Sequence, residues 1–298
     1  MRSPLLLIGA LASLAAVGCV APPDDRPDAE AASQTATALV VVERTTGPGD
    51  AVRGDAVIAR FVRVHQGAVD DQALRIAGAA WDLPAPGTCS TGERTEAQLA
   101  LQPRSVDLLD VGVLTVDGAS NANANKATVL LPRAMPDPTG VVSGVFYSGR
   151  SAEAFAPAAR LQLHTNGGPD MPEGFVVNVA SPRDVADVRV SSLSNGGGNG
   201  GSGSSGSSAA LEVAWEAEAV SNDARDVVYV DVLGPSSRLV ARCTTLDVGS
   251  LVVPASALGA IDEGQLAVHR LHRESFRAKG IEPGEIRFDI ARVVTFKR

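Results

Sequence analysis

Aromatic residues are scarce in this chain of 298 residues: they make up 4% of it, with two tryptophans and two tyrosines. A carbohydrate-binding face normally presents several exposed aromatic rings, so the composition argues against that class of binding protein. Histidine is also rare, with four in the whole chain. No catalytic triad of aspartate, histidine and serine can be assembled from the order of residues along the chain alone.

The chain also lacks an excess of basic residues. Lys and Arg total 26 against 34 Asp and Glu, which gives a net charge of −8 at pH 7. No basic cluster occurs in the sequence, and binding to nucleic acid depends on neutralising phosphates with Lys and Arg. We therefore predict no nucleic acid among the partners. No cofactor-binding motif is present, so we predict no cofactor either.

Hydrophobic runs long enough to span a membrane are missing too. After Arg2, the apolar run Leu5 to Val17 has 13 residues, and as a helix it would reach about 20 Å, short of the roughly 30 Å of a hydrocarbon core. Its length is typical of the apolar region of an export signal. Residues 1–18 are therefore predicted to be a signal peptide.

The signal ends at Ala16-Val17-Gly18-Cys19. These four residues resemble the lipobox of bacterial lipoproteins, although Ala16 stands where the family usually has Leu. The resemblance implies cleavage before Cys19, lipidation of that cysteine and a membrane anchor of two or three acyl chains, which hold firmly. The same residues also fit ordinary secretory cleavage, which would yield a soluble secreted protein. Val20 does not resemble the aspartate that retains some lipoproteins in the inner membrane, so the outer membrane of the bacterial cell envelope is the expected location.

Cysteine usage agrees with export. If Cys19 is lipidated, two of the three cysteines remain available to pair, Cys89 and Cys243. In an oxidising compartment this pair is a candidate disulfide, and the alternative is two separately buried thiols.

Two low-complexity segments divide the chain. Residues 20–37 lack large apolar side chains and are expected to form a disordered tether behind the lipidated Cys19. Residues 194–208 consist entirely of Gly, Ser and Asn and are expected to form either a linker between domains or a loop within one. We favour a linker, which gives a β-rich lobe over residues 38–193 and a second β-sandwich lobe over residues 209–298.

Alternation of apolar and polar residues predicts strands in both lobes. The predicted strands are 38–44, 55–65, 73–80, 96–101, 106–116, 128–131, 141–147 and 173–180, followed by 211–216, 227–233, 238–243, 250–254, 265–270 and 285–296. Only residues 151–159 and 255–261 are expected to form short helical turns. The fold class is therefore all-β, with two β-sandwich-like lobes.

In the C-terminal lobe, Trp215 alternates with glutamates and is expected to lie in the core. The region around Trp215, Cys243, Asp247 and Pro254 is loosely similar to the immunoglobulin-like modules of bacterial surface proteins. That similarity implies a sandwich and carries no active-site motif.

His269 and His272 are the first candidates for a metal site. Their surroundings predict a strand, on which residues three apart point to opposite faces, so the two are not expected to bind a metal together. Asp117, with Asn121, Asn123 and Asn125, lies in a polar loop that lacks the acidic positions and the glutamate of a calcium loop. We predict no metal site.

Catalytic candidates are equally weak. Ser143 lies in Gly-x-x-Ser-Gly, which is not the spacing of a nucleophile elbow. His65 and His164 stand alone near strand ends. The carboxylate pairs Asp70-Asp71 and Glu216-Glu218 are more typical of a turn and of a solvent-facing strand.

The sequence therefore predicts a lipid-anchored envelope protein with a structural or protein-binding role and no catalytic activity, its partner being another envelope protein. Two alternatives stay open: an envelope hydrolase whose residues meet only in the folded chain, and a soluble secreted β protein.

Overall fold

A computed structural model describes residues 36–47, 55–64, 68–91, 105–118, 127–136, 141–151, 154–193, 209–218 and 226–298. The signal peptide, Cys19, most of the predicted tether, the run 194–208, the predicted strand 96–101, His65 and the three loop asparagines lie outside the described residues. Residues from Gln34 to Arg298 form one compact unit.

The described chain is nearly all β, as the sequence predicts, with two short helices. Its strands are β1 (Ala36–Thr46), β2 (Ala56–Val64), β3 (Thr88–Thr91), β4 (Val106–Leu108), β5 (Leu114–Gly118), β6 (Thr128–Leu130), β7 (Pro132–Ala134), β8 (Val142–Arg150), β9 (Arg160–Thr165), β10 (Phe175–Ala180), β11 (Arg189–Leu193), β12 (Ala210–Ala214), β13 (Val227–Leu233), β14 (Leu239–Leu246), β15 (Ser250–Val253), β16 (Glu263–Ala278) and β17 (Ile281–Lys297). The helices are α1 (Asp71–Ile76) and α2 (Ala255–Leu258).

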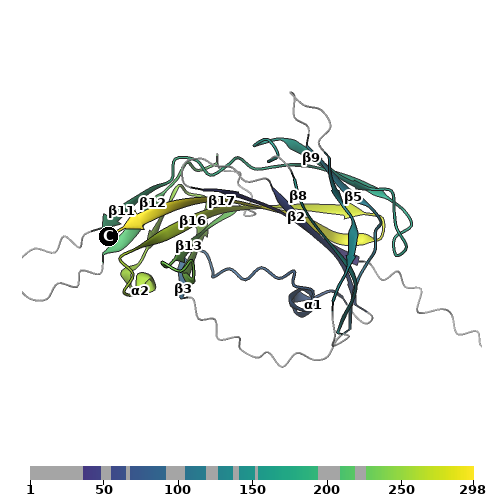
Figure 1. Cartoon of the computed structure of the whole chain (residues 1–298), viewed down its shortest axis with the longest axis horizontal. Helices are drawn as coiled ribbons and strands as arrows, with labels where there is room; N and C mark the ends of the chain where they lie inside the picture. Colours follow the sequence, from purple (N-terminus) through teal and green to yellow (C-terminus); the bar gives the residue numbers. More distant parts are fainter. Residues whose placement is uncertain are drawn as a thin grey trace, which may run out of the picture. The chain divides into compact units, whose positions relative to one another are not determined.

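The largest element is a sheet of ten strands in the order β3-β14-β13-β16-β17-β1-β2-β4-β8-β7. Its centre is the hairpin of β16 and β17, the two longest strands, which cross the picture in Figure 1. The first strand, β1, pairs in parallel with the last strand, β17. Residues from the two ends of the described chain therefore lie side by side in the middle of the sheet.

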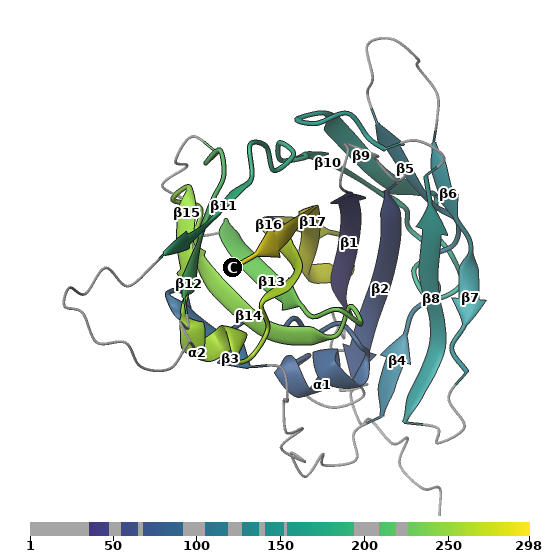
Figure 2. The same cartoon turned by 60° about the vertical axis from the view of Figure 1, so that its left-hand side comes forward.

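Two smaller sheets pack on one face of the large sheet, which we call the core face; it carries Val40, Val230 and Phe288. One has four strands in the order β10-β9-β5-β6, and the other has three in the order β11-β12-β15. Figure 2 shows them as separate groups of strands. This layering is that of a β-sandwich.

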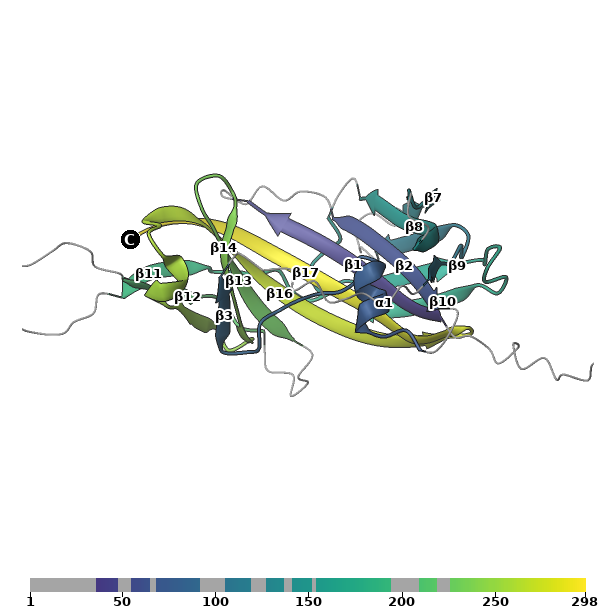
Figure 3. The same cartoon turned by 90° about the horizontal axis from the view of Figure 1, so that it is seen from below.

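The opposite face of the large sheet, which we call the α1 face, carries Leu39, Val41 and Val62. These side chains pack with Ala73 and Ala77 of the α1 region. Figure 3 shows α1 beside β1 and β2. Both faces of β1 are therefore buried, which explains its nearly continuous apolar sequence.

The core face holds two apolar clusters rather than one. The first gathers side chains of the four-stranded sheet against β1, β2 and the turn end of the β16–β17 hairpin, including Phe61, Phe175 and Phe276. The second gathers the three-stranded sheet against β13, β14 and the other end of the same hairpin, including Trp215. Trp215 is 5% exposed, so its predicted core position is confirmed.

The structure differs from the predicted division into two lobes at residues 194–208. The ten-stranded sheet contains strands from both sides of that run, because β1 and β2 join β13, β14, β16 and β17. The run itself connects β11 to β12, which are antiparallel neighbours with Leu193 opposite Ala210. It is therefore a connection between paired strands of one sheet and does not separate two domains.

Several predicted elements also need correction. Residues 73–80, predicted as a strand, contain none: 73–76 are the end of α1 and 77–80 follow it. The helix is capped by the Asp70 carboxylate, which accepts a hydrogen bond from the Ala73 amide at 2.9 Å. The predicted strand 106–116 is two strands, β4 and β5, of different sheets. Of the predicted turn 151–159, the described residues are not helical, whereas α2 falls within the predicted 255–261. β1 begins at Ala36, so the last two residues of the predicted tether belong to this strand.

Cys89 and Cys243 form a disulfide that joins β3 to β14, where the two residues are directly opposite in register. Cys243 is fully buried in the second apolar cluster, and Cys89 packs against it. The bond fastens the edge strand β3, which follows α1 in the chain, to the large sheet. Among the described helices, neither has the length and apolar character needed to cross a bilayer.

Candidate functional site

A row of buried charge lies on the core face between the two apolar clusters. Arg44 on β1 and Arg270 on β16 are both directly opposite Ile290 of β17. Arg44 donates from Nε to Asp55 Oδ1 at 2.7 Å, and Arg270 donates from Nε to Asp247 Oδ2 at 2.8 Å. Burial lowers the pKa of Arg44, but its contacts with Asp55 and Asp184 together outweigh this and raise the pKa overall.

Both arginines also hold the segment that connects the two small sheets. Arg44 Nη1 lies 2.5 Å from Asp184 Oδ1, and Arg270 Nη1 donates to the Asp184 carbonyl at 3.2 Å. Arg270 donates further to the carbonyl of Glu216 at 2.7 Å. Both guanidinium groups donate their hydrogen bonds to oxygens of the chain itself. We therefore interpret this row of buried charge as a group that stabilises the fold.

A polar cluster on the α1 face is formed by side chains of four neighbouring strands, β14, β13, β16 and β17. Its five members are Arg242, Tyr229, Asp231, His269 and Asp289. Tyr229 donates from its hydroxyl to Asp289 Oδ2 at 2.8 Å, and His269 Nδ1 lies 2.9 Å from Asp289 Oδ1. The Tyr229 and His269 rings stack with centroids 4.2 Å apart, and Arg242 lies over the other side of Tyr229 at 4.8 Å. Burial raises the pKa of Tyr229 well above its usual value, and Asp289 adds to the effect.

The second nitrogen of His269 also faces a carboxylate. Its Nε2 lies 4.0 Å from Asp231 Oδ2, and Asp231 is held by Arg242 through two contacts of 2.6 Å. A triad-type base keeps one nitrogen for a carboxylate and turns the other toward a nucleophile. His269 has no such free side, because both nitrogens face aspartates.

His272 shows the same arrangement on the other face of β16. Its Nδ1 lies 2.5 Å from Asp226 Oδ1, and its Nε2 lies 3.2 Å from Glu274 Oε1. Burial lowers the pKa of His272, but the contacts with Asp226 and Glu274 together outweigh it, so the pKa is raised. The register pairs His269 with Ala291 and His272 with Phe288, so the two histidines point to opposite faces, as the strand pattern predicts.

The other predicted candidates lie apart from one another. His164 is on the four-stranded sheet, with Nδ1 3.3 Å from Asp117 Oδ2. Ser143 donates to Asp107 at 2.9 Å in a pairing of β8 with β4. Asp70 caps α1, so the pair that it forms with Asp71 belongs to a helix start rather than to a site.

Glu216 and Glu218 follow β12 and contact the buried charge row. The Glu216 carbonyl accepts from Arg270, and a Glu218 carboxylate oxygen lies 3.8 Å from Arg270 Nε. Within the described ranges, no group of three or more His, Cys, Asp or Glu side chains is placed to hold a metal ion.

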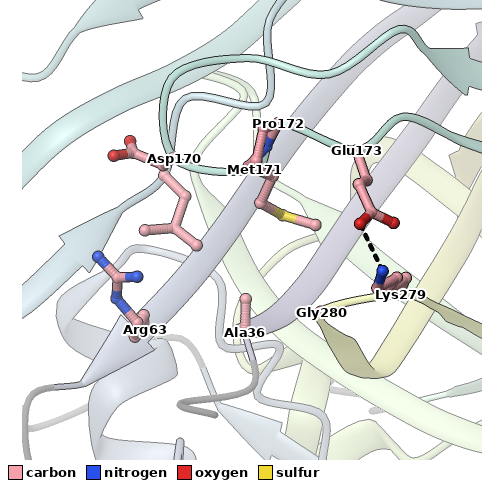
Figure 4. Close-up of a pocket in the computed structure, with 9 residues that line it drawn as sticks. Ala36, Arg63, Asp170, Met171, Pro172, Glu173, Lys279 and Gly280 are labelled. Carbon is pink, nitrogen blue, oxygen red and sulfur yellow. Dashed lines mark hydrogen bonds and ion pairs between the residues drawn. The ribbon is translucent and has the colours of Figure 1, made fainter. Parts of the chain in front are cut away.

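A cavity of about 200 Å³ lies where β1 begins, beside the turn between β16 and β17. It is lined by Ala36, Arg63, Leu109, Asp170, Met171, Pro172, Glu173, Lys279 and Gly280. In Figure 4, Met171 projects between the Glu173–Lys279 ion pair and Arg63. The volume of this cavity is below the roughly 300–1,000 Å³ typical of ligand pockets, so the cavity does not indicate a ligand-binding function.

One group of side chains has no motif in the sequence: the arginines Arg60, Arg273 and Arg287 on the α1 face. They come from three strands whose neighbourhood is set only by the fold. The only sign of them in the sequence is that each alternates along its strand with core residues such as Phe61 and Phe288, which places it on the opposite face.

No family model matches this sequence, and no curated protein matches it either.

Proposed function

We propose that this chain is a lipid-anchored protein of the bacterial cell envelope with a structural or protein-binding role and no catalytic activity. The observation that carries the location is Ala16-Val17-Gly18-Cys19 after a short apolar run. Lipid on Cys19 would hold the mature chain to the membrane, with the outer membrane as the expected site. The partner that this role implies is another envelope protein.

The non-catalytic part of the proposal is supported by how the histidines of β16 are held. His269 lies between Asp289 and Asp231, and His272 lies between Asp226 and Glu274. Both nitrogens of each imidazole are thereby directed at carboxylates, which favours a role in fixing strands over a role as a general base.

The anchor is tested by expressing the full chain in a Gram-negative host. We expect wild-type protein in the membrane fraction, cleaved before Cys19 and heavier by its acyl chains in an intact-mass measurement. A Cys19→Ser variant should lose the acyl mass and the membrane association. Ala16→Leu, which restores the residue usual in the family, is the matched control and should be processed at least as well as wild type.

Globomycin, which inhibits the lipoprotein signal peptidase, should cause the uncleaved precursor to accumulate. A mature product with an unmodified thiol at Cys19, or one that is processed normally in the presence of the inhibitor, would contradict the proposal and favour a secreted protein.

A further inference from the structure

Two arginines are directly opposite each other on the α1 face of the large sheet. Arg273 of β16 and Arg287 of β17 form a cross-strand pair in the antiparallel ladder. Cβ atoms of such a pair lie about 4.5–5.5 Å apart, and like charges in this position destabilise a sheet. A pair of this kind requires a compensating negative charge.

A third arginine reaches the same region from β2. A Cβ on Gly78, just after α1, would lie 3.5 Å from Arg60 Nη2. Arg287 Nη1 donates at 3.5 Å to the carbonyl of the next residue, Ala79. The guanidinium groups of Arg60 and Arg287 therefore both lie beside residues 78 and 79.

Two of these guanidinium groups are incompletely satisfied. The Nε atoms of Arg60 and Arg273 are buried and have no hydrogen-bond partner within the described part of the chain. A buried donor without a partner costs free energy, more so when it is charged. Burial lowers the pKa of both arginines, and Arg287 adds to the effect on Arg273.

The nearby carboxylates compensate these arginines only in part. Glu285 is engaged by Arg287 Nε and also acts on Arg273, so one carboxylate serves both members of the cross-strand pair. Asp289 is shared by Tyr229 and His269. Glu43 acts on Arg60 and raises the pKa of that arginine, but burial outweighs it and lowers the pKa overall.

We propose that Arg60, Arg273 and Arg287 form a binding site for a small oxyanion, a phosphate or carboxylate group, beside the end of α1. Guanidinium groups offer paired N–H donors that match two oxygens of such a group. The anion would separate the charges of Arg273 and Arg287 and accept hydrogen bonds from the donors that lack partners. This site is independent of the anchor on Cys19.

The test uses the full chain in a non-ionic detergent, with inorganic phosphate and citrate as separate probes and sodium chloride at matched ionic strength as the reference. We expect saturable binding of at least one probe by calorimetry, together with a rise in Tm that chloride does not produce. The probe that binds more tightly shows whether the site prefers phosphate or carboxylate oxygens.

Arg273→Gln should weaken that binding at least tenfold, because it removes one charge and its donors. Arg277→Gln is the matched control: Arg277 lies on the same strand, is exposed and pairs with Glu282 at 3.4 Å. It should bind the probe as wild type does. Arg60→Gln should weaken binding in the same way as Arg273→Gln.

Without added anion, Arg273→Gln should have a Tm equal to or above that of wild type, since it relieves the repulsion across the strands. Absence of saturable binding, or equal binding by the Arg273→Gln and Arg277→Gln variants, would overturn the proposal. A lower Tm of Arg273→Gln without any response to either anion would show instead that the arginine only braces the end of α1.

Discussion

Arg44 and Arg270 lie on either side of Ile290 in one row of the large sheet, and both contact Asp184. Asp184 belongs to the segment between β10 of the four-stranded sheet and β11 of the three-stranded sheet. One row of charge thus fixes the passage of the chain from one small sheet to the other. It also separates the two apolar clusters of the core face.

The first prediction concerns the Asp55 carboxylate, which accepts from Arg44 Nε and Nη2 at 2.7 and 2.8 Å and is fully buried. Asp55→Asn should lower the free energy of unfolding by about 3–5 kcal/mol, because it leaves a buried guanidinium with only the partly exposed Asp184 to balance its charge. Urea denaturation measures the change.

The matched control is Asp82→Asn. Asp82 also binds an arginine through two contacts, at 2.6 and 2.7 Å from Arg75, but on the surface. Its removal should cost less than about 1 kcal/mol. Equal losses in the two variants would show that the buried row has no special part in stability.

The second prediction concerns pH. The pKa of His272 is raised above its usual 6.5 in the folded chain. The folded state therefore holds this proton more tightly than the unfolded state, so the contribution is complete below about pH 6.5 and is lost as the pH rises through the folded pKa. His272→Gln should remove that component from the pH dependence of unfolding.

Asp226→Asn provides the control, because Asp226 is the partner that raises the pKa most. An NMR titration should give His272 a lower pKa in this variant than in wild type. A wild-type pKa at or below 6.5 would refute the prediction.

The third prediction concerns the Cys89–Cys243 bond, which links residues 154 positions apart. Replacing both cysteines by alanine should lower the free energy of unfolding by about 2–5 kcal/mol, as loss of a native disulfide does in small exported domains. Wild-type protein under reducing conditions should match the double variant. Alkylation of both cysteines in denatured, unreduced wild type would show that the bond does not form.

The fourth prediction concerns Gly144, which has φ +102° where β8 pairs in parallel with β4. A Cβ at this residue would lie 1.8 Å from the Leu108 carbonyl oxygen. Gly144→Ala should therefore cost more than about 3 kcal/mol, measured by thermal or urea unfolding. Gly47→Ala, where a Cβ meets nothing within 4 Å, should change stability by less than about 0.5 kcal/mol. Similar stabilities of the two variants would contradict this role of Gly144.

The local pattern of apolar and polar residues is sufficient to predict a strand where those residues alternate clearly. Residues 227–233 were predicted as a strand and form β13 with the same bounds. It was insufficient at residues 73–80, whose apolar content is equally compatible with a short helix. There the Asp70 cap, an interaction with the Ala73 amide, decides the structure.

Pairing between distant strands could not be read from composition. The Gly/Ser run at 194–208 has the composition expected of a linker between domains, and a loop within one domain can have the same composition. What decides between them is that Leu193 pairs with Ala210 and that β1 pairs with β17. The same limit hid Arg60, Arg273 and Arg287, since each looks like an ordinary polar residue of its own strand.

The pairing of β1 with β17 also has a consequence for biosynthesis. The first described strand has its parallel partner in the last described strand, so the centre of the large sheet cannot close until both strands have been synthesised. Such long-range pairing slows folding. Under the export that we propose, this order would allow translocation to begin before the native sheet is able to form.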